Sequence, residues 1–198
     1  MQNWLKNITL EGHQVRLIPL EKEHQSDLLQ AASDGKLWEL WFTSVPSDKS
    51  MDSYIDKALQ EKANGMSLPF TVLDARSSKV IGSTRYLNVE PEHRRLEIGA
   101  TWYAQSYHRS AVNTECKYLL LHHAFESLNC IAVEFRTNWF NRKSRAAIER
   151  LGARQDGVLR NHRINPDGSF RDSVVYSITD REWSGVKKSL LLALNPDD

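Results

Sequence analysis

A loop that turns directly into a helix offers the clearest chemistry in this 198-residue sequence. Tyr107–Leu128 begins with small and polar residues, and apolar residues then recur three and four positions apart, as in an amphipathic helix. The first backbone N–H groups of such a helix have no intrahelical acceptor, and the positive end of the helix dipole lies beside them. Together they can bind an anion, and Arg109 in the loop would add a full positive charge. This pattern predicts a phosphate-bearing cofactor, with the alternative that Asn113 or Thr114 simply caps a structural helix.

The elements around this loop predict a mixed α/β domain. Leu96–Tyr103, directly before the loop, has the length and composition of a strand, and Cys130–Arg136, beyond the helix, alternates like another strand. A strand–helix–strand unit of this kind should be parallel and right-handed. Turn-like residues separate three β runs at 68–73, 79–89 and 94–103, which indicates an antiparallel meander. Further expected elements are a strand at 15–20, helices at 21–32, 50–64 and 141–151, a β pair at 157–163 and 171–179 around a turn at 165–168, and a short helix in the tail at 181–198.

Composition limits the partners of the chain. There are 26 Lys plus Arg against 25 Asp plus Glu, a balance that disfavours nucleic acid as a partner. No apolar run approaches the ~20 residues that span a bilayer, and the N-terminus lacks a secretory apolar region, so no membrane partner is expected. Cys116 and Cys130 should be buried as small hydrophobic residues. His122 and His123 would point ~100° apart on a helix, so we expect no metal site. These features predict a soluble, cytoplasmic protein.

Aromatic residues are the candidates for a substrate-binding surface. The segment 37–46 carries Trp38 and Trp41 ahead of a proline. These residues form either a hydrophobic plug or interface element, or an aromatic wall over a substrate groove. Tyr86 is a further candidate for substrate binding, and the alternative is that it packs in the core.

The order of elements and two segments resemble the GNAT superfamily of acetyl-CoA-dependent N-acetyltransferases over about 15–179. The run VEFRTN at 133–138, followed by NRKSRAAIERLGA at 141–153, is similar to the RimJ/RimL-type branch, which acetylates the N-terminal residue of ribosomal proteins. The loop before the long helix departs from the family pattern, because Ala111 and Asn113 stand where two glycines are expected. Ala111 can keep a helical backbone, and Asn113 tolerates unusual φ angles better than most residues.

The resemblance implies the roles of several residues. Glu97 would be the general base, acting through a water, unless it is a surface residue paired with Arg94 or Arg95. Ser144 would protonate the coenzyme sulfur, unless it is an ordinary first-turn serine. Arg136, Arg142 and Arg145 could meet the 3′-phosphoadenosine or coat a solvated face. The residues expected to bind the cofactor are Ile98, Gly99, Ala100, His108, Arg109, Ser110, Ala111, Val112, Asn113, Thr114, Arg136 and Asn141, the first two through backbone N–H groups that polarise the thioester carbonyl.

The prediction is therefore a GNAT fold in one domain, 1–198, with a mostly antiparallel sheet of six to seven strands flanked by helices. The strand of Glu97 and the strand of Val133 should splay apart. The implied function is transfer of acetyl from acetyl-CoA, without a metal, to a protein or peptide N-terminal α-amine by direct attack. A small-molecule amine as acceptor and a non-catalytic acyl-CoA-binding module are the alternatives. Trp38, Trp41 and the apolar tail favour a homodimer.

Overall fold

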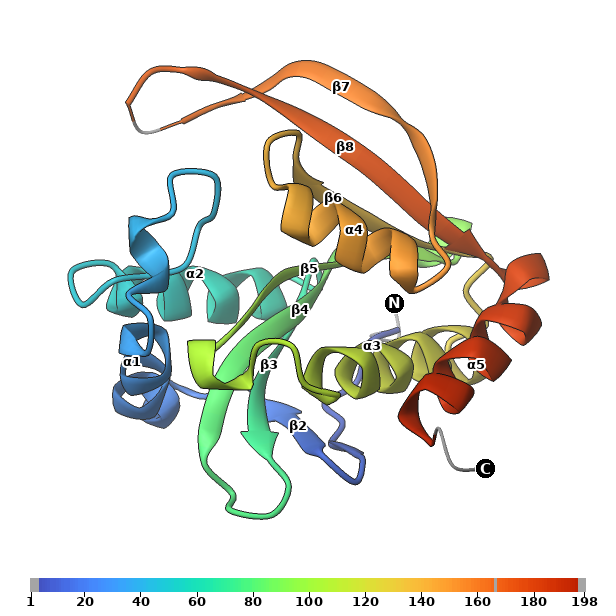
Figure 1. The fold of residues 1–198 in the computed structure, drawn as a ribbon, viewed down its shortest axis with the longest axis horizontal. Helices are drawn as coiled ribbons and strands as arrows, with labels where there is room; N and C mark the ends of the chain where they lie inside the picture. Colours follow the sequence, from blue (N-terminus) through green and yellow to red (C-terminus); the bar gives the residue numbers. More distant parts are fainter. Residues whose placement is uncertain (1–3, 166, 196–198) are drawn as a thin grey trace.

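A single sheet of eight strands organises the computed structural model, which describes residues 4–165 and 167–195 (Figure 1). The strand order is β1-β2-β3-β4-β5-β6-β8-β7, and every neighbouring pair is antiparallel except the parallel pair β5–β6. The mixed, mostly antiparallel sheet is thus confirmed. The sequence predicted six to seven strands, and the additional strand is β1, whose two residues are too few to show a periodic pattern. The strands are β1 (Leu10–Glu11), β2 (Val15–Pro19), β3 (Leu68–Asp74), β4 (Val80–Glu90), β5 (Arg95–Tyr103), β6 (Ala132–Asn138), β7 (Arg154–Ile164) and β8 (Phe170–Thr179).

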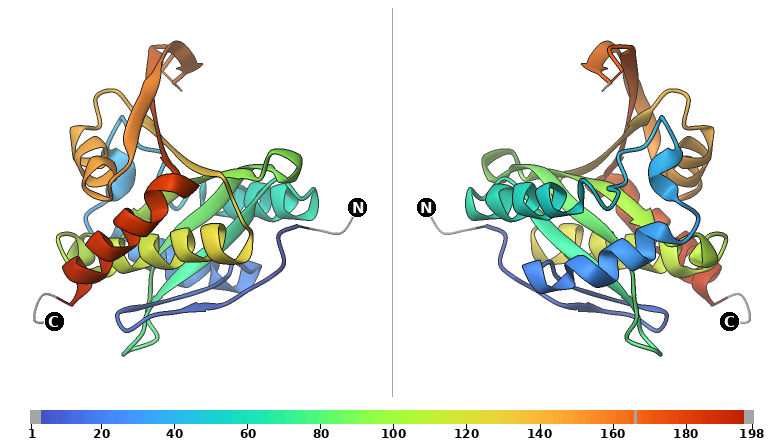
Figure 2. Two further views of the ribbon diagram at one scale, coloured as in Figure 1. Left: turned by 90° about the vertical axis from the view of Figure 1, so that its right-hand side faces the viewer. Right: turned by 90° about the vertical axis from the view of Figure 1, so that its left-hand side faces the viewer.

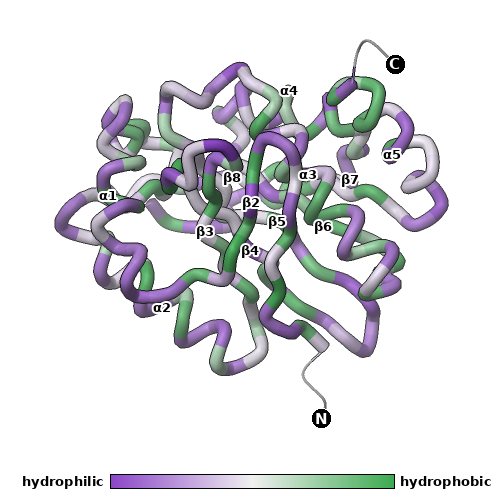
Figure 3. Tube along the Cα trace, turned by 90° about the horizontal axis from the view of Figure 1, so that it is seen from below, coloured by the Kyte–Doolittle hydropathy of each residue, from purple (hydrophilic) through white to green (hydrophobic). Residues whose placement is uncertain are grey.

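Helices cover both faces of the sheet. α1 (Gln25–Ser33) and α2 (Met51–Ala63) pack on one face around a core that includes Trp102. α3 (Val112–His122), α4 (Arg142–Arg150) and α5 (Asp180–Leu194) pack on the other face, and a π-helical turn, His123–Ser127, extends α3. Along the Cα trace, hydrophobic residues recur in the central strands, whereas hydrophilic residues are frequent in the turns (Figure 3). No helix among the described residues is long and apolar enough to cross a bilayer.

The C-terminal helix is longer than the short helix expected in the tail. α5 spans 15 residues, and Trp183, Val186 and Leu190 are its buried side chains. The Trp183 ring stacks on Phe125 with centroids 5.2 Å apart. Only every third or fourth position of α5 therefore contributes to the core, and the rest of its apolar residues are partly or largely exposed.

The parallel pair β5–β6 is short, and this feature opens the sheet. Only three positions pair, ending at Glu97↔Glu134, although β5 continues to Tyr103 and β6 to Asn138. The two strands therefore diverge beyond Glu97, as predicted. Past this point, the edge of β5 that faces β6 has no strand partner among the described residues. Its backbone N–H and C=O groups are thus available to a ligand.

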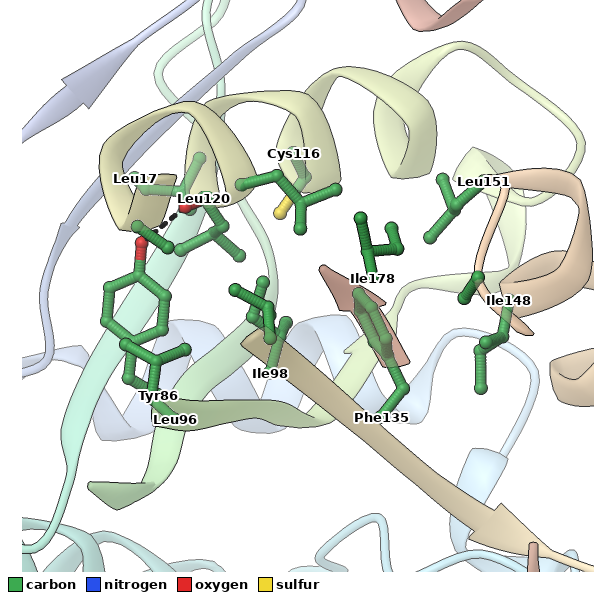
Figure 4. Packing of buried hydrophobic residues seen from close by; sticks show 14 of the residues in the cluster. Leu17, Tyr86, Leu96, Ile98, Cys116, Leu120, Phe135, Ile148, Leu151 and Ile178 are labelled. Atoms are coloured by element: carbon green, nitrogen blue, oxygen red, sulfur yellow. Dashed lines mark hydrogen bonds between the residues drawn. The ribbon is translucent and has the colours of Figure 1, made fainter. Parts of the chain in front are cut away.

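Tyr86 belongs to the core and not to an acceptor surface. Its side chain is fully buried, and its hydroxyl donates a hydrogen bond of 2.7 Å to the Leu120 carbonyl of α3 (Figure 4). The prediction that Tyr86 binds substrate is therefore wrong. Strand periodicity identifies inward positions, but it does not say which face of the sheet meets the acceptor.

The last two strands form a long hairpin that rises from the body of the molecule (Figures 1 and 2). β7 is an edge strand, and most of its residues are exposed. The expected β pair is confirmed, with both strands longer than predicted. Pro166, part of the turn expected at 165–168, lies outside the described residues.

Candidate active site

Glu97 lies where β5 and β6 diverge. Leu96 and Ile98 on either side pack in the α3-side core, so alternation along the strand points Glu97 to the opposite face. Its side chain is buried, accepts a hydrogen bond of 2.7 Å from Asn88 Nδ2, and lies 3.7 Å from Arg136 Nε. The alternative of a surface glutamate paired with Arg94 or Arg95 is therefore wrong.

The surroundings of Glu97 raise the pKa of its carboxyl above the ordinary value for a glutamate. Burial raises the pKa of Glu97, and the neighbouring Glu134 carboxylate raises it further, against the lowering effects of Arg136 and Asn88. A general base works best when its pKa approaches the operating pH. The geometry and the direction of the pKa shift thus agree with the predicted role.

Arg136 is held by carboxylates on the same face. Its Nε bonds to Glu134, the residue directly opposite Glu97, and lies 3.7 Å from Glu97 Oε2. Arg95 completes the group at 3.7 Å from Glu134. The expectation that Arg136 meets the 3′-phosphoadenosine conflicts with this arrangement, because its charge is balanced at the face away from α3. Arg136 is two residues from Glu134 along β6, so both side chains leave the same face of the sheet.

Gly99 and Ala100 shape the strand next to Glu97. A Cβ on Gly99 would lie 2.7 Å from Glu97 Oε1, so a larger residue here would displace the carboxylate from this position. Ala100 has a φ of +48°, and the β4–β5 register shifts around it. This bulge turns β5 away from regular pairing beside the opening between β5 and β6.

The loop before α3 keeps its first N–H groups unpaired. A short 3₁₀ turn, Gln105–Tyr107, precedes it, and Ser110 Oγ donates to the Tyr107 carbonyl at 2.6 Å. Val112 N–H makes one long bond, 3.3 Å, to Ser110 Oγ. Within the part of the chain that the structure describes, the backbone N–H groups of residues 109–111, 113 and 114 have no hydrogen-bond acceptor. Five donors are thus left for an anion at the start of α3.

The missing glycines do not disturb this loop. Ala111 is the N-cap of α3 with helical angles, φ −69° and ψ −12°, and its side chain is exposed. The left-handed residue is Arg109, with φ +61°. Neither Ala111 nor Asn113 therefore needs the conformation that glycine favours. The alternative that Asn113 or Thr114 caps the helix is wrong, because α3 begins before both of them. His108 is tied back by its Nε2, 2.9 Å from the Tyr103 carbonyl.

α4 begins directly after β6 and carries Asn141 and Ser144. Asn141 is the N-cap, and its Oδ1 accepts a hydrogen bond of 3.0 Å from Ser144 N–H, so the predicted cap is confirmed. Arg145 Nε donates to Tyr176 Oη at 3.1 Å, and the guanidinium lies over the Trp139 ring, 4.4 Å from its centroid. Arg145 therefore has a structural role, whereas Arg142 is exposed.

The two tryptophans of segment 37–46 have different environments. Trp38 packs against the core under α1 and α2, as expected of a plug. Trp41 is exposed, and its ring centroid lies 5.6 Å from that of Phe140 in the loop between β6 and α4. Trp41 and Phe140 thus form an exposed aromatic pair, and a role of Trp41 in substrate binding stays a prediction; Phe140 was not among the predicted residues.

A buried lysine on α3 is a second feature that the sequence analysis missed. Lys117 is 5% exposed, and its Nζ donates to Thr101 Oγ1 at 2.6 Å, which in turn lies 2.7 Å from Thr84 Oγ1. No carboxylate pairs with it among the described residues, and burial lowers its pKa to about 8. Lys117 is four residues after Asn113, one of the unpaired donors, on the same side of α3. The sequence signal for the burial of Lys117 was its position within the apolar stripe of the predicted helix.

Comparison with known proteins identifies the class. A family model for the acetyltransferase (GNAT) domain matches residues 14–154. The chain belongs to the GNAT family and is an N-acetyltransferase, an enzyme of a family that uses acetyl-CoA. Within residues 4–165 and 167–195, no group of three or more His, Cys, Asp or Glu is placed to hold a metal ion.

Three known proteins are similar to this chain. YdaF of Bacillus subtilis, named as a candidate ribosomal N-acetyltransferase, is 34% identical over 100 residues, which cover 50% of this chain and about half, 54%, of YdaF. The structure of a candidate acetyltransferase from T. thermophilus is 36% identical, with a TM-score of 0.83 over 96% of this chain and 99% of that chain. Mycobacterium smegmatis RimJ in complex with CoA-disulfide shares the fold, at 23% identity and a TM-score of 0.75 over 90% and 88% of the two chains.

Proposed function

We propose that the enzyme moves the acetyl group of acetyl-CoA directly to the N-terminal α-amine of a protein or peptide within a ternary complex. The observation that carries the proposal is the opening between β5 and β6, which has Glu97 on one face and the α3 N-terminus beyond the other. The names of YdaF and RimJ support a protein acceptor and a CoA donor, respectively.

The residues present fit the donor. Five unpaired N–H groups at the start of α3, with Arg109, would bind its pyrophosphate. The unpaired edge of β5 past Glu97, near Ile98 and Gly99, would orient its pantetheine arm, and Asn141 would contact this arm from the start of α4. When bound, acetyl-CoA supplies the thioester that the amine attacks.

Proton transfers are assigned to two side chains. Glu97 accepts the proton of the incoming ammonium group through a water, which leaves the amine nucleophilic. Ser144 Oγ would give a proton to the departing thiolate and regain one, through water, from the nitrogen that becomes the amide. Free α-amines titrate near pH 8, so the base is needed for only part of the amine population. Loss of Glu97 should therefore slow the reaction most at low pH.

The test is an acceptor panel. The protein is incubated with acetyl-CoA and a mixture of peptides, polyamines and amino acids, and acetylation is measured by mass spectrometry. Acetylated peptide N-termini support the proposal, whereas exclusive acetylation of polyamines or free amino acids favours the small-molecule alternative. A Glu97→Gln, Ser144→Ala double variant with undiminished thiol release would refute both catalytic roles. If calorimetry detects no CoA binding, the enzyme and the acyl-CoA-module hypotheses both fail.

Three further predictions accompany this function. We infer one acetyltransferase domain over residues 1–198, with its core at 15–179. A cytoplasmic location and a homodimer remain predictions from the sequence. Size-exclusion chromatography with light scattering tests the dimer.

A further inference from the structure

One face of the β6–β8–β7 part of the sheet carries charged side chains beside Glu97. Alternate residues of these strands pack in the α3-side core, among them Val133, Phe135, Val174, Tyr176 and Ile178. The residues between them therefore point to the face of Glu97. On β6 these residues are Glu134 and Arg136, and on β8 the same alternation reaches Arg171.

Strand register brings a second arginine to the same place. Arg163 of β7 lies directly opposite Arg171 of β8, so their side chains leave the same face of the hairpin. The register shifts between Leu159 and Arg163, where Asn161 has a φ of +47°. This irregularity also places His162 on that face, with its Nδ1 2.9 Å from Ser173 Oγ.

These two arginines lack a counter-charge. Arg136 is balanced by Glu134 and Glu97, but neither Arg163 nor Arg171 has an ion-pair partner within the described ranges. Arg171 Nε is buried and has no hydrogen-bond acceptor among the described atoms. Like charges directly opposite each other on a sheet are destabilising unless an anion joins them. Two adjacent guanidinium groups suit a carboxylate or a phosphate.

Arg163 and Arg171 each interact electrostatically with Glu97. Burial raises the pKa of Glu97, and Arg163 is among the cations that oppose the rise. Burial lowers the pKa of Arg171, the charge of Arg163 lowers it further, and Glu97 opposes the change. Burial likewise lowers the pKa of His162, and the three arginines add to this effect. A surplus of positive charge thus faces the position of the acceptor amine.

We propose that Arg163 and Arg171 bind an anionic side chain of the acceptor, which makes an acidic peptide N-terminus the preferred substrate class. This inference rests on the proposed acetyl transfer to an α-amine at Glu97. Arg171 lies four residues along β8 from Val175, the partner of Arg136, a span of ~13 Å at ~3.3 Å per residue. An extended peptide covers that span in about four residues. The acidic group therefore belongs within the first few residues of a peptide, because the carboxylate of a free amino acid adjoins its amine.

The experiment compares two peptides that differ only in charge, Ala-Asp-Glu-Asp and Ala-Asn-Gln-Asn at their N-termini. Wild-type kcat/KM should favour the acidic peptide about tenfold or more, mainly through KM. The double variant Arg163→Gln, Arg171→Gln should lose this preference, so that its kcat/KM values for the two peptides become equal whatever their common level. Arg160→Gln is the matched control, because Arg160 lies on the same strand, is exposed, and pairs with Asp172 at 3.1 Å. This control should keep the preference.

Binding of the N-acetylated products, measured by fluorescence anisotropy without acetyl-CoA, separates the two proposals. Tighter binding of the acidic product to the wild-type chain, lost in the double variant and kept in Arg160→Gln, supports the arginine site independently of turnover. Equal rates and equal binding for both peptides would overturn the inference and leave the acetyl transfer standing. If no amine in any peptide is acetylated, the proposed function fails, and binding alone then decides the arginine site.

Discussion

Lys117 should destabilise the folded enzyme at neutral pH, and its replacement by methionine should relieve the effect. The side chain is 5% exposed, and burial lowers its pKa from 10.5 to about 8. The unfolded chain therefore holds this proton more tightly than the folded chain. At ~1.4 kcal/mol per pKa unit, the shift corresponds to a loss of ~3 kcal/mol of folding free energy when both states are protonated.

The sign of the pH dependence follows from this difference. Below pH 8 both states carry the proton, and the full loss is present. Between about pH 8 and pH 10.5 the unfolded chain binds more protons than the folded chain, so this group makes stability rise with pH. Integration leaves a loss of ~2 kcal/mol at pH 9 and less than ~1 kcal/mol at pH 10.

The assay is urea unfolding of wild type and Lys117→Met between pH 7 and pH 10. Methionine preserves most of the side-chain volume, and Thr101 Oγ1 keeps its contact with Thr84 Oγ1 at 2.7 Å. Lys117→Met should be more stable than wild type by ~1–3 kcal/mol at pH 7, since the lost hydrogen bond offsets part of the gain. The difference between the two proteins should shrink as the pH rises.

The difference in stability between wild type and Lys117→Met cancels the contribution of groups that titrate alike in both proteins. Burial raises the pKa of Cys130, and this thiol makes stability fall with rising pH in both proteins equally. Burial also raises the pKa of Cys116, and the charge of Lys117 opposes this rise, so loss of that charge makes the methionine variant lose more stability at high pH and shrinks the difference further. Lys57→Met is the control, because Lys57 is an exposed lysine of α2 and its difference from wild type should not change with pH. A constant difference between Lys117→Met and wild type across this range, or a methionine variant less stable than wild type at pH 7, would refute the reasoning.

Three other predictions concern single side chains. The buried Glu115 carboxylate accepts N–H bonds of 2.9, 2.6 and 2.8 Å from residues 13–15, so Glu115→Gln should lower the free energy of unfolding by ~2 kcal/mol in urea, and an unchanged value would contradict the anchoring role. Since burial raises the pKa of Glu97 above 4.5, the acid limb of kcat/KM should titrate above that pH in wild type and move up to the pKa of the substrate amine, about 8, in Glu97→Gln, whereas the same limb in both would remove Glu97 as the base. Asn141→Ala should lower the free energy of unfolding by ~1 kcal/mol, measured by calorimetry. Asn141→Ser should restore most of this free energy if capping is the cause.

The periodic and capping patterns of the sequence were enough for most of the fold. The apolar spacing after Val112 defined α3, alternation defined the strands, and Asn141 marked the start of α4. These signals are local, because a helix or strand buries residues at a fixed period along its own chain. The resemblance in 133–153 supplied the family, which the match to residues 14–154 confirms.

What the sequence left open depends on contacts between distant segments. Periodicity marked Tyr86 and Glu97 as strand residues, but only the packing of α3 shows that they face opposite sides of the sheet. The burial of Lys117 follows from the packing of α3 on β5, which places the Thr101 hydroxyl 2.6 Å from its Nζ. Pairing of Arg163 with Arg171 requires the bulge in β7, and a one-residue shift in register moves side chains to the other face. Local pattern therefore determined the elements, and tertiary packing decided which charges share a site.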